Sequence, residues 1–387
     1  MTNNRLKVLF IGEYSGVFTQ LIKSLKRKNI DCFIISNGDG YKSYPSDIFV
    51  VYNQKPTKNL IIRIYRNIIY RLGLHGLLTL VKKWGQLKPY LSGYDIVQLV
   101  NPVPLSGFGS IPNLFFVRYI NKHNKKIFLS ALGDDYYVVK WFSKNYPRSN
   151  YYSDNNFILN LIKPKSILMY KYCFLYKYLN NYIIKISESI IPGLDCYKRA
   201  YNWTNKTTKV IPFPLEKNLI GKPIKITNDE TIVIFHGWQK GRESSKGNDV
   251  FDKVLSKIKL KYGERIKYIV VQSIPYSDYI KLFSSAHIFI DQLYADDKGV
   301  NGLLGMAAGK VVFSGFDIRA LESYPNYKGN IIGIDSINNE EYLFNKFSEI
   351  IDNPQIIETI SHNAIEFVKD NHDSDYIANL YIKEWTK

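Results

Sequence analysis

Carboxylates, amides and glycines are concentrated between residues 291 and 302, in a polar stretch that separates two short apolar runs. The first run, Ile288–Ile290, is expected to be a strand, and the polar stretch leads into a helix of small residues. Glycines let a backbone approach a ligand closely, and the start of a helix offers unpaired N–H groups to an anion. The candidate ligand-binding residues are Asp291, Gln292, Asp296, Asp297, Gly299, Val300, Asn301 and Gly302.

A second candidate loop begins at His236 and Gly237, after an apolar run that reads as a strand. It carries Arg242 and Lys246 shortly before a predicted helix. Fixed positive charge beside the first N–H groups of a helix is suited to holding a diphosphate. Because any exposed loop can carry Arg and Lys, this pattern is weak when it is taken alone.

A third candidate is Pro275-Tyr276, which follows the next predicted strand of the second half. A planar base could stack against the tyrosine ring at such a position. A plain turn explains the same two residues equally well, because proline and its neighbours commonly begin turns.

Two loops of the first half also follow predicted strands. Gly12 and Gly16 bound a loop after the first strand, and they serve either backbone approach to a substrate or a tight turn. Asp134 and Asp135 follow a later strand. Carboxylates at the carboxyl end of a parallel strand lie where ligands bind in open α/β sheets, whereas Asp135 could instead N-cap the next helix.

A strand–loop–helix pattern that recurs along the chain positions all of these loops. One series begins at the apolar run 7–11, and a second series follows the proline-punctuated stretch 210–214. Two successive series of this kind predict an α/β protein with two Rossmann-like domains. We assign residues 1–212 to the first domain, 213–370 to the second, and 371–387 to a C-terminal helix.

Positive charge is confined to the first half of the chain. Residues 1–212 hold 31 Lys and Arg against 10 Asp and Glu, whereas residues 213–387 hold 21 against 24. A basic surface attracts polyanions or an anionic membrane, or it is simply a soluble surface rich in lysine. The basic segment 59–84 is expected to be one amphipathic helix, which either lies on a membrane or packs on the sheet. The Tyr- and Lys-rich segment 163–186 suits a membrane interface, single-stranded nucleic acid or ordinary packing.

Cysteine usage and hydropathy bear on the compartment. Three scattered cysteines form neither a disulfide framework nor a metal-binding pattern, which suits a reducing compartment. The N-terminal residues lead directly into a strand, and no apolar run reaches the roughly 18 residues that a membrane span needs. We therefore expect a cytoplasmic protein that associates peripherally with the inner face of the cell membrane.

On these motifs the sequence resembles the GT-B glycosyltransferases, and in particular the retaining family-four kind of bacterial surface polysaccharide synthesis. That family carries G-R-x(n)-K-G, which is matched here by Gly241, Arg242, Lys246 and Gly247. It also carries E-x-F-G-x-x-x-x-E-A-M-A-x-G-x-P-V, which aligns with D-D-K-G-V-N-G-L-L-G-M-A-A-G-K-V-V. The resemblance implies two Rossmann-like domains facing a central cleft, with the C-terminal helix crossing back to the first domain. It also implies that Arg242 and Lys246 bind the pyrophosphate.

The match departs from the family at one informative position. The first family Glu falls on Asp296, but the second, which would hold the donor ribose, falls on Leu304. A leucine side chain cannot accept a hydrogen bond. Either Asn301, about one helical turn earlier, contacts the ribose, or the donor binds differently. Asp297 could share the sugar-reading role of its neighbour.

The resemblance implies transfer of a sugar from a UDP- or GDP-sugar to a saccharide or polyprenyl-diphosphate-linked acceptor in capsule, O-antigen or exopolysaccharide assembly. No metal is expected, because no D-x-D pair follows a strand. Retention needs no separate base, whereas Asp134 or Asp135 would be the base of an inverting enzyme. The basic first domain would meet the acceptor and an anionic membrane surface.

Other classes of function stay open. One is a non-catalytic protein that keeps the fold, has no Glu at position 304 and binds nucleotides or carbohydrates. A GT-B-type sugar-nucleotide epimerase is the nearest enzymatic alternative, and it would need no acceptor. Binding of nucleic acid is disfavoured, because no RNA-binding signature appears and two Rossmann-like halves argue against it.

Overall fold

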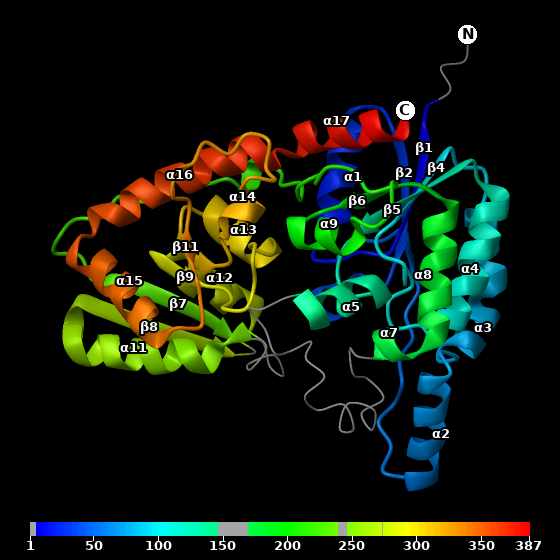
Figure 1. Cartoon of the computed structure of the whole chain (residues 1–387), viewed down its shortest axis with the longest axis horizontal. Coiled ribbons are helices and arrows are strands. Elements are labelled where there is room, and N and C mark those ends of the chain that lie inside the picture. The colour runs from blue at the N-terminus through cyan, green and yellow to red at the C-terminus, as the bar shows by residue number, and fades with distance from the viewer. Residues whose placement is uncertain (1–4, 146–168, 239–245, 273) are drawn as a thin grey trace. The chain divides into compact units, whose positions relative to one another are not determined.

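The computed structural model describes residues 5–145, 169–238, 246–272 and 274–387. The chain divides into two compact units (Figure 1). The first, called here the N-terminal domain, runs to Pro214 and is completed by Ser374–Lys387. The second, called the C-terminal domain, spans Leu215–Asp373. Each domain contains a parallel sheet and helices, which confirms the predicted α/β architecture.

The sheet of the N-terminal domain has six strands, and all neighbouring pairs are parallel. The order β3-β2-β1-β4-β5-β6 is that of a Rossmann sheet. Its central strands are mostly apolar because both faces are covered, and Leu9 and Leu99 are fully buried. The strands are β1 (Lys7–Ile11), β2 (Asp31–Ser36), β3 (Ile48–Phe49), β4 (Ile96–Leu99), β5 (Lys126–Ala131) and β6 (Ser187–Pro192).

The helices of this domain correct one prediction. Residues 59–84 form two helices instead of one, because Gly73 and Gly76 between them have φ angles of 62° and 82°. Glycine adopts this left-handed conformation without strain, and it interrupts the helix. The helices are α1 (Val17–Arg27), α2 (Leu60–Arg71), α3 (Leu77–Leu87), α4 (Ser110–His123), α5 (Tyr136–Asn145), α7 (Met169–Tyr172), α8 (Phe174–Ile186) and α9 (Asp195–Tyr201).

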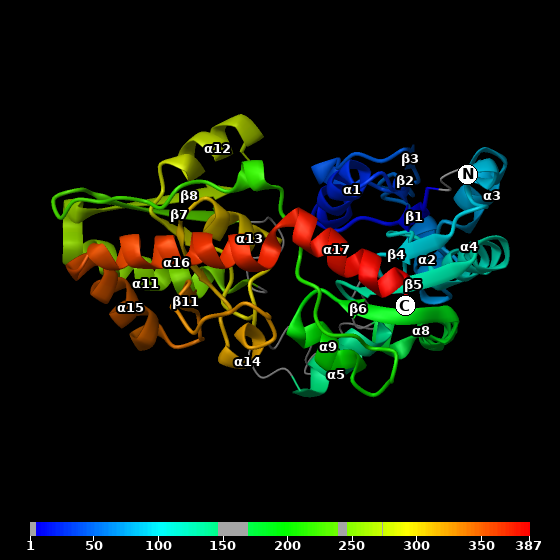
Figure 2. The same cartoon turned by 90° about the horizontal axis from the view of Figure 1, so that it is seen from above.

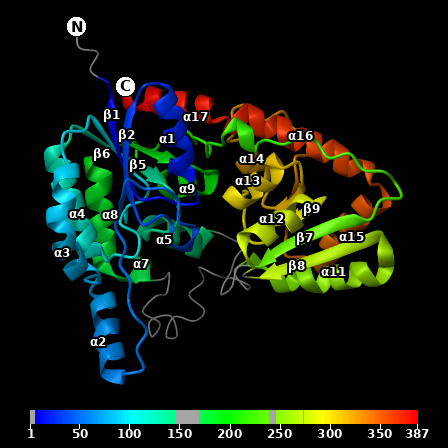
Figure 3. The same ribbon diagram turned by 180° about the vertical axis from the view of Figure 1, so that it is seen from behind.

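The C-terminal domain contains a five-stranded parallel sheet of order β11-β10-β9-β7-β8. Its core lies between this sheet and the helices α11 and α15, which pack side by side (Figure 3). The strands are β7 (Ile232–Trp238), β8 (Ile266–Gln272), β9 (Ile288–Ile290), β10 (Val311–Ser314) and β11 (Ile334–Asp335). The helices are α11 (Asn248–Tyr262), α12 (Tyr276–Ser284), α13 (Val300–Ala307), α14 (Ile318–Leu321), α15 (Glu340–Asp352) and α16 (Gln355–His372).

The last helix, α17 (Ser374–Trp385), belongs to the N-terminal domain and packs along α1 (Figure 2). Asp375 accepts hydrogen bonds from Ser24 and Arg27 of α1. Trp385 is buried, and its Nε1 donates to Gln98 Oε1 on β4 over 2.9 Å. A buried indole with a satisfied N–H ties the end of the chain to the sheet, as the resemblance implies.

Candidate functional site

In open α/β sheets, ligands bind beyond the carboxyl ends of the strands at the point where the strand order reverses. In the C-terminal domain this point lies between β7 and β9, because β8 follows β7 on one side and β10 follows β9 on the other. The chain leaves β9 at Asp291, and α11 and α13 begin after the strands of this same edge. Most residues of the predicted ligand loops therefore gather at one edge of the sheet.

Lys246 and Asp291 form an ion pair at this edge. The Lys246 Nζ lies 3.2 Å from Asp291 Oδ1, and the two side chains are 13% and 3% exposed. Ser314, at the end of β10, donates from its Oγ to Asp291 Oδ2 over 2.9 Å. Because both carboxylate oxygens accept bonds within the domain, Asp291 orients the ammonium group of Lys246. Sequence reasoning missed Ser314, although its place at the end of a strand was the available signal.

Helix α13 begins beside this pair. A Cβ on Gly302 would lie 3.0 Å from Asp291 Oδ2, which is closer than ordinary side-chain contacts allow. Glycine at this position therefore lets the first turn of the helix approach the carboxylate. Gly299 precedes the first helical residue, Val300, and both are half-buried. The start of α13, with its N–H groups, lies close to the Lys246–Asp291 pair.

Two residues of α13 bear on the predicted ribose contact. Asn301 is exposed and Leu304 is half-buried, and residues three apart are neighbours on a helix surface. Gly305, where the family has Ala, has a packing explanation. A Cβ there would lie 2.7 Å from the Phe289 ring and 2.9 Å from Val312 Cγ2. The backbone of the helix therefore packs directly against these side chains of the sheet.

Asp297 is committed to a buried ion pair. Its Oδ1 accepts from Lys298 Nζ over 3.1 Å, and its Oδ2 accepts from the Tyr324 hydroxyl over 2.8 Å. Both charged side chains are 1% exposed, and the ammonium lies 3.9 Å from the centre of the Tyr324 ring. Burial lowers the pKa of Lys298, and the neighbouring carboxylate opposes that shift. The buried pair of Asp297 and Lys298 therefore supports the loop from inside the C-terminal domain.

Asp296 and Gln292 lie in the same loop. Asp296 is buried, and its backbone carbonyl accepts from the Asp317 N–H over 2.9 Å. Gln292 is half-buried, and its Nε2 approaches the Asp297 carbonyl at 3.5 Å. Backbone carbonyls of the loop between β9 and α13 thus accept bonds from Asp317 and from Gln292.

His236 is buried near the end of β7. Trp238 Nε1 can only donate, and it lies 3.2 Å from His236 Nδ1, so Nδ1 accepts and Nε2 carries the proton. Nε2 then donates to Asn248 Oδ1 over 3.2 Å, which links the strand to the start of α11. Burial lowers the pKa of His236 to about 4, so the ring is neutral at pH 7. Gly237 lies against the Tyr279 ring, which would be 3.2 Å from an added Cβ.

The structure describes Pro275 fully, Tyr276 only in its backbone, and Arg242 not at all. Pro275 is exposed and precedes α12, and its carbonyl accepts from the N–H groups of Asp278 and Tyr279. Tyr276 is the first residue of α12, and its side chain lies outside the described part of the structure. Arg242 also lies outside the described residues.

In the N-terminal domain, Gly12 and Gly16 are required by packing. Gly12 has a φ angle of 87°, and an added Cβ would lie 2.3 Å from Val100 Cγ1. Only glycine fits this conformation and this approach to the end of β4. Gly16 lies against the Tyr44 ring, 2.6 Å from an added Cβ. The loop between them is therefore a tightly packed turn at the point where the order of this sheet reverses.

Glu13, inside that loop, was not singled out from the sequence. It is fully buried, and its carboxylate accepts from the N–H groups of Phe18 and Thr19 and from the Thr19 hydroxyl. These bonds satisfy N–H groups in the first turn of α1. Burial nevertheless raises the pKa of Glu13 to about 7.

Asp135 has the same arrangement at the next helix. Its Oδ1 accepts from the N–H groups of Tyr137 and Val138, and its Oδ2 accepts from the Tyr201 hydroxyl over 2.8 Å. It is the N-cap of α5, which was the structural alternative that the sequence left open. Burial raises the pKa of Asp135 to about 7.

Asp134 differs from its neighbour because it is only half-buried. Burial raises the pKa values of Tyr14 and Tyr197, and the Asp134 carboxylate adds to both shifts. A Cβ on the preceding Gly133 would lie 3.1 Å from the Tyr14 ring. The structure thus brings the loop after β1 and the loop after β5 together.

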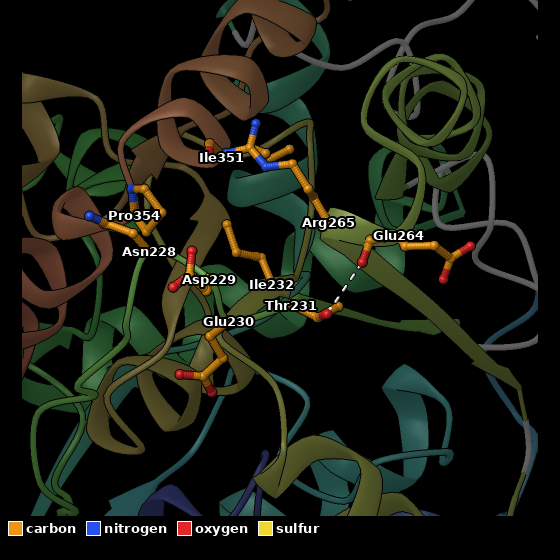
Figure 4. A pocket seen from close by; sticks show the side chains of 9 residues that line it. All are labelled: Asn228, Asp229, Glu230, Thr231, Ile232, Glu264, Arg265, Ile351 and Pro354. Carbon is orange, nitrogen blue, oxygen red and sulfur yellow. Dashed lines mark hydrogen bonds between the residues drawn. The ribbon is translucent and has the colours of Figure 1, made fainter.

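A shallow pocket at the opposite edge of the C-terminal sheet is a poor site for an anionic ligand (Figure 4). It lies where β7 and β8 begin, and Thr231 Oγ1 donates there to the Glu264 carbonyl over 3.2 Å. Asp229, Glu230 and Glu264 line it against a single Arg265. Their negative charge would repel a diphosphate.

Within the described ranges, no three His, Cys, Asp or Glu side chains are grouped so that they could hold a metal ion. Among the same residues, no helix is both long enough and apolar enough to span a membrane.

Comparison with known proteins identifies the fold. No protein-family profile and no curated protein matches the sequence. The structure of Anabaena Alr3699/HepE in complex with UDP-glucose matches with a TM-score of 0.59 and 13% identity, over 99% of this chain and 100% of that one. A glycosyltransferase from Rickettsia africae ESF-5 matches with a TM-score of 0.56 and 16% identity, over 99% of this chain and 98% of that one. Identities this low show the fold alone, and the chain has the GT-B fold of two Rossmann-like domains.

A putative UDP-N-acetylglucosamine 2-epimerase from Listeria monocytogenes has a similar structure. It matches with a TM-score of 0.51 and 10% identity, over 98% of this chain and 95% of that one. One fold thus accommodates both transferases and epimerases, so the reaction has to be argued from the residues of the site.

Proposed function

We propose that this protein is a glycosyltransferase that moves a sugar from a UDP- or GDP-sugar to a saccharide or lipid-linked saccharide acceptor. The observation that carries the proposal is the Lys246–Asp291 pair at the reversal point of the C-terminal sheet. A lysine whose side chain is partly exposed, and whose ammonium is paired with a buried carboxylate beside the start of α13, is suited to binding a diphosphate. The binding of UDP-glucose by HepE, which shares the fold, supports a nucleotide sugar as donor.

In the reaction, the bond between the anomeric carbon and the diphosphate oxygen breaks, and the acceptor oxygen bonds to that carbon. Negative charge grows on the departing diphosphate, where Lys246 and the first N–H groups of α13 would stabilise it. Arg242, which lies outside the described residues, would add a second positive charge. Asp296 and Asn301 would read the sugar and the ribose.

The acceptor proton has two possible destinations. In the retaining reaction that we propose, it passes to the leaving phosphate and no separate base is needed. An inverting reaction would need a carboxylate in the N-terminal domain. Asp134 is better placed for that role than Asp135, because Asp134 is half-buried whereas Asp135 is fully buried.

We further propose an acceptor carried on a polyprenyl diphosphate at the inner face of the cell membrane, in assembly of a bacterial surface polysaccharide. The excess of 31 Lys and Arg over 10 Asp and Glu in residues 1–212 supports this proposal. An anionic lipid surface attracts such a domain, whereas a soluble neutral acceptor explains no asymmetry of charge.

The test is a panel of UDP- and GDP-sugars in thermal unfolding, followed by assay of nucleoside diphosphate release with lipid-linked acceptors. A ligand at about 100 times its dissociation constant adds about 2.7 kcal/mol to stability, which raises the melting temperature. Release of diphosphate that depends on the acceptor is the expected result. Donor binding without release would indicate a binding protein, and conversion of the sugar without acceptor would indicate an epimerase.

A further inference from the structure

Helix α2 exposes the apolar side chains that amphipathic helices ordinarily bury. None of its residues is buried, and it projects from the rest of the N-terminal domain (Figures 1 and 3). Single exposed apolar residues are common on protein surfaces, but a group of them on one helix marks an interaction site. Ile62, on the other side of the helix, is 40% exposed. The exposed apolar residues of the remaining side are Leu60 at 65%, Ile61 at 76%, Ile64 at 52%, Tyr65 at 61%, Ile68 at 51% and Leu72, just after the helix, at 49%.

These six residues lie on one side of the helix and are called here the α2 stripe. At 3.6 residues per turn, their spacing places them within an arc of about 140°. Arg63 and Arg66 lie on the opposite side, and Arg66 donates from its guanidinium to the Lys55 carbonyl over 2.7 Å. Arg71, in the last turn, is exposed and falls within the same arc, so the helix is amphipathic with one basic residue at the C-terminal end of its apolar side. No other part of the described chain covers that side.

The charge around α2 indicates what the stripe meets. The chain has no Asp or Glu between Asp47 and Asp95, and over the same interval it has eight basic residues. Two copies of this chain that met through the stripe would bring two such basic segments together, and like charges repel. An anionic lipid surface offers apolar acyl chains to the stripe and negative headgroups to the lysines and arginines.

We propose that α2 lies in the plane of an anionic lipid surface and inserts the α2 stripe into the boundary between headgroups and acyl chains. This inference rests on the membrane-facing part of the proposed function. It adds apolar insertion by one defined helix to the long-range attraction of a basic domain. Tyr65 suits that boundary, because its ring is apolar and its hydroxyl reaches polar surroundings.

The test compares a triple variant of the stripe with a double control variant. Both are assayed by flotation with vesicles of phosphatidylcholine and phosphatidylglycerol. Ile61→Asn, Ile64→Asn and Ile68→Asn are combined in the stripe variant. The control variant combines Leu260→Asn and Ile331→Asn, which are 88% and 64% exposed in the C-terminal domain. Because all five side chains are exposed, both variants should keep the wild-type melting temperature.

The wild type and the control variant should float both at low salt and at about 0.5 M NaCl, where electrostatic attraction to the surface is strongly screened. The stripe variant should partition about tenfold more weakly for each isoleucine replaced. Flotation of the stripe variant like the wild type would overturn the proposal, as would failure of the wild type to bind. A wild-type dimer that becomes monomeric in the stripe variant, with vesicle binding unchanged, would assign the stripe to a protein interface and also overturn it.

Insertion can be observed directly with a fluorophore. The three native cysteines are buried, so Ile64→Cys should be the principal site of labelling with an environment-sensitive dye, with Leu260→Cys as control. Vesicles should shift the emission to the blue only for the label at 64. Thermal stabilisation by UDP, measured on the same samples, reports on the donor site alone. Stabilisation by UDP without flotation would reject the membrane role of α2 and keep the donor site. Flotation without stabilisation by UDP would reject the donor site and keep the membrane role of α2.

Discussion

The carboxyl edges of the two sheets use buried carboxylates in opposite ways. In the C-terminal domain, Asp291 pairs with the ammonium of Lys246, whose side chain remains 13% exposed. In the N-terminal domain, Glu13 and Asp135 have no cation as a hydrogen-bond partner among their described contacts. They accept bonds from N–H groups at the starts of α1 and α5, and from the hydroxyls of Thr19 and Tyr201.

This difference separates an edge that is suited to binding an anion from an edge whose buried carboxylates cap helices. A lysine that is paired with a carboxylate keeps its positive charge, so a partly exposed side chain such as that of Lys246 can still attract an anion that approaches the edge. A carboxylate that caps a helix fills the anion position itself, so no phosphate can take it. We infer that the donor diphosphate belongs to the C-terminal edge, and that the N-terminal edge provides a shaped surface for the acceptor.

The largest expected effect tests the cation of the C-terminal edge. Lys246→Ala should lower the transfer rate by about 100- to 1,000-fold, as does removal of a group that stabilises developing charge elsewhere. The matched control is Lys253→Ala, an exposed lysine of α11 that pairs with Glu340. Steady-state assay of nucleoside diphosphate release measures both variants. Equal activity of the two would place the diphosphate elsewhere.

The second prediction concerns pH. The folded-state pKa values of Glu13 and Asp135 are raised to about 7 from 4.5 and 3.8, so the folded N-terminal domain binds more protons than the unfolded chain between these limits. Its stability should therefore rise as the pH falls from 7.5 to 5. His236 has a pKa lowered to about 4 from 6.5, so the C-terminal domain should lose stability as the pH falls through that range. Each group should contribute about 2 kcal/mol.

Hydrogen exchange measured by mass spectrometry, corrected for the intrinsic rate at each pH, resolves the two domains. Peptides from β1 and α5 should gain protection at pH 5, and peptides from β7 and α11 should lose it. Glu13→Gln with Asp135→Asn should remove most of the N-terminal response, and His236→Gln should reduce the C-terminal response. A change in protection in the same direction in both domains would contradict the expected difference between their buried titratable groups.

The third prediction concerns the approach of α13 to Asp291. Gly302→Ala places a Cβ 3.0 Å from Asp291 Oδ2, and it should cost about 1–2 kcal/mol and weaken donor binding by displacing the Lys246–Asp291 pair. Gly85→Ala, in α3, meets nothing within 4 Å and should stabilise the protein by about 0.5–1 kcal/mol. Urea unfolding and donor titration measure both. A neutral effect of Gly302→Ala would show that the helix start can move away from the pair.

The smallest expected effect concerns the ribose. Asn301→Ala should weaken donor binding by about 1 kcal/mol, roughly fivefold, if its amide contacts the ribose. Leu304→Glu, on the same side of α13, should restore that affinity in the Asn301→Ala background. Isothermal titration with the donor found in the panel measures the cycle. If the two substitutions change donor affinity independently of each other, another part of the domain contacts the ribose.

Several elements were predictable because their signals are local. The runs at 7–11 and 126–130 are strands because uninterrupted apolar residues require burial on both faces of a sheet. The break in the helix predicted over 59–84 was missed, because helical periodicity continues across Gly73 and Gly76 while their backbone conformation does not. The cap made by Asp135 was foreseen as an alternative, but its partner Tyr201 is 66 residues away and carries no local signal.

Residue pattern alone determined the two α/β series, the basic first half and the loops at the strand ends, because periodicity, charge and glycine placement are local properties. The tertiary structure decided which carboxylates pair and which cap. Asp291 meets Lys246 and Ser314 only after three separate strand ends are brought to one edge. It also decided that the apolar side of α2 faces outward, because periodicity shows that a helix has an apolar side but not what covers it.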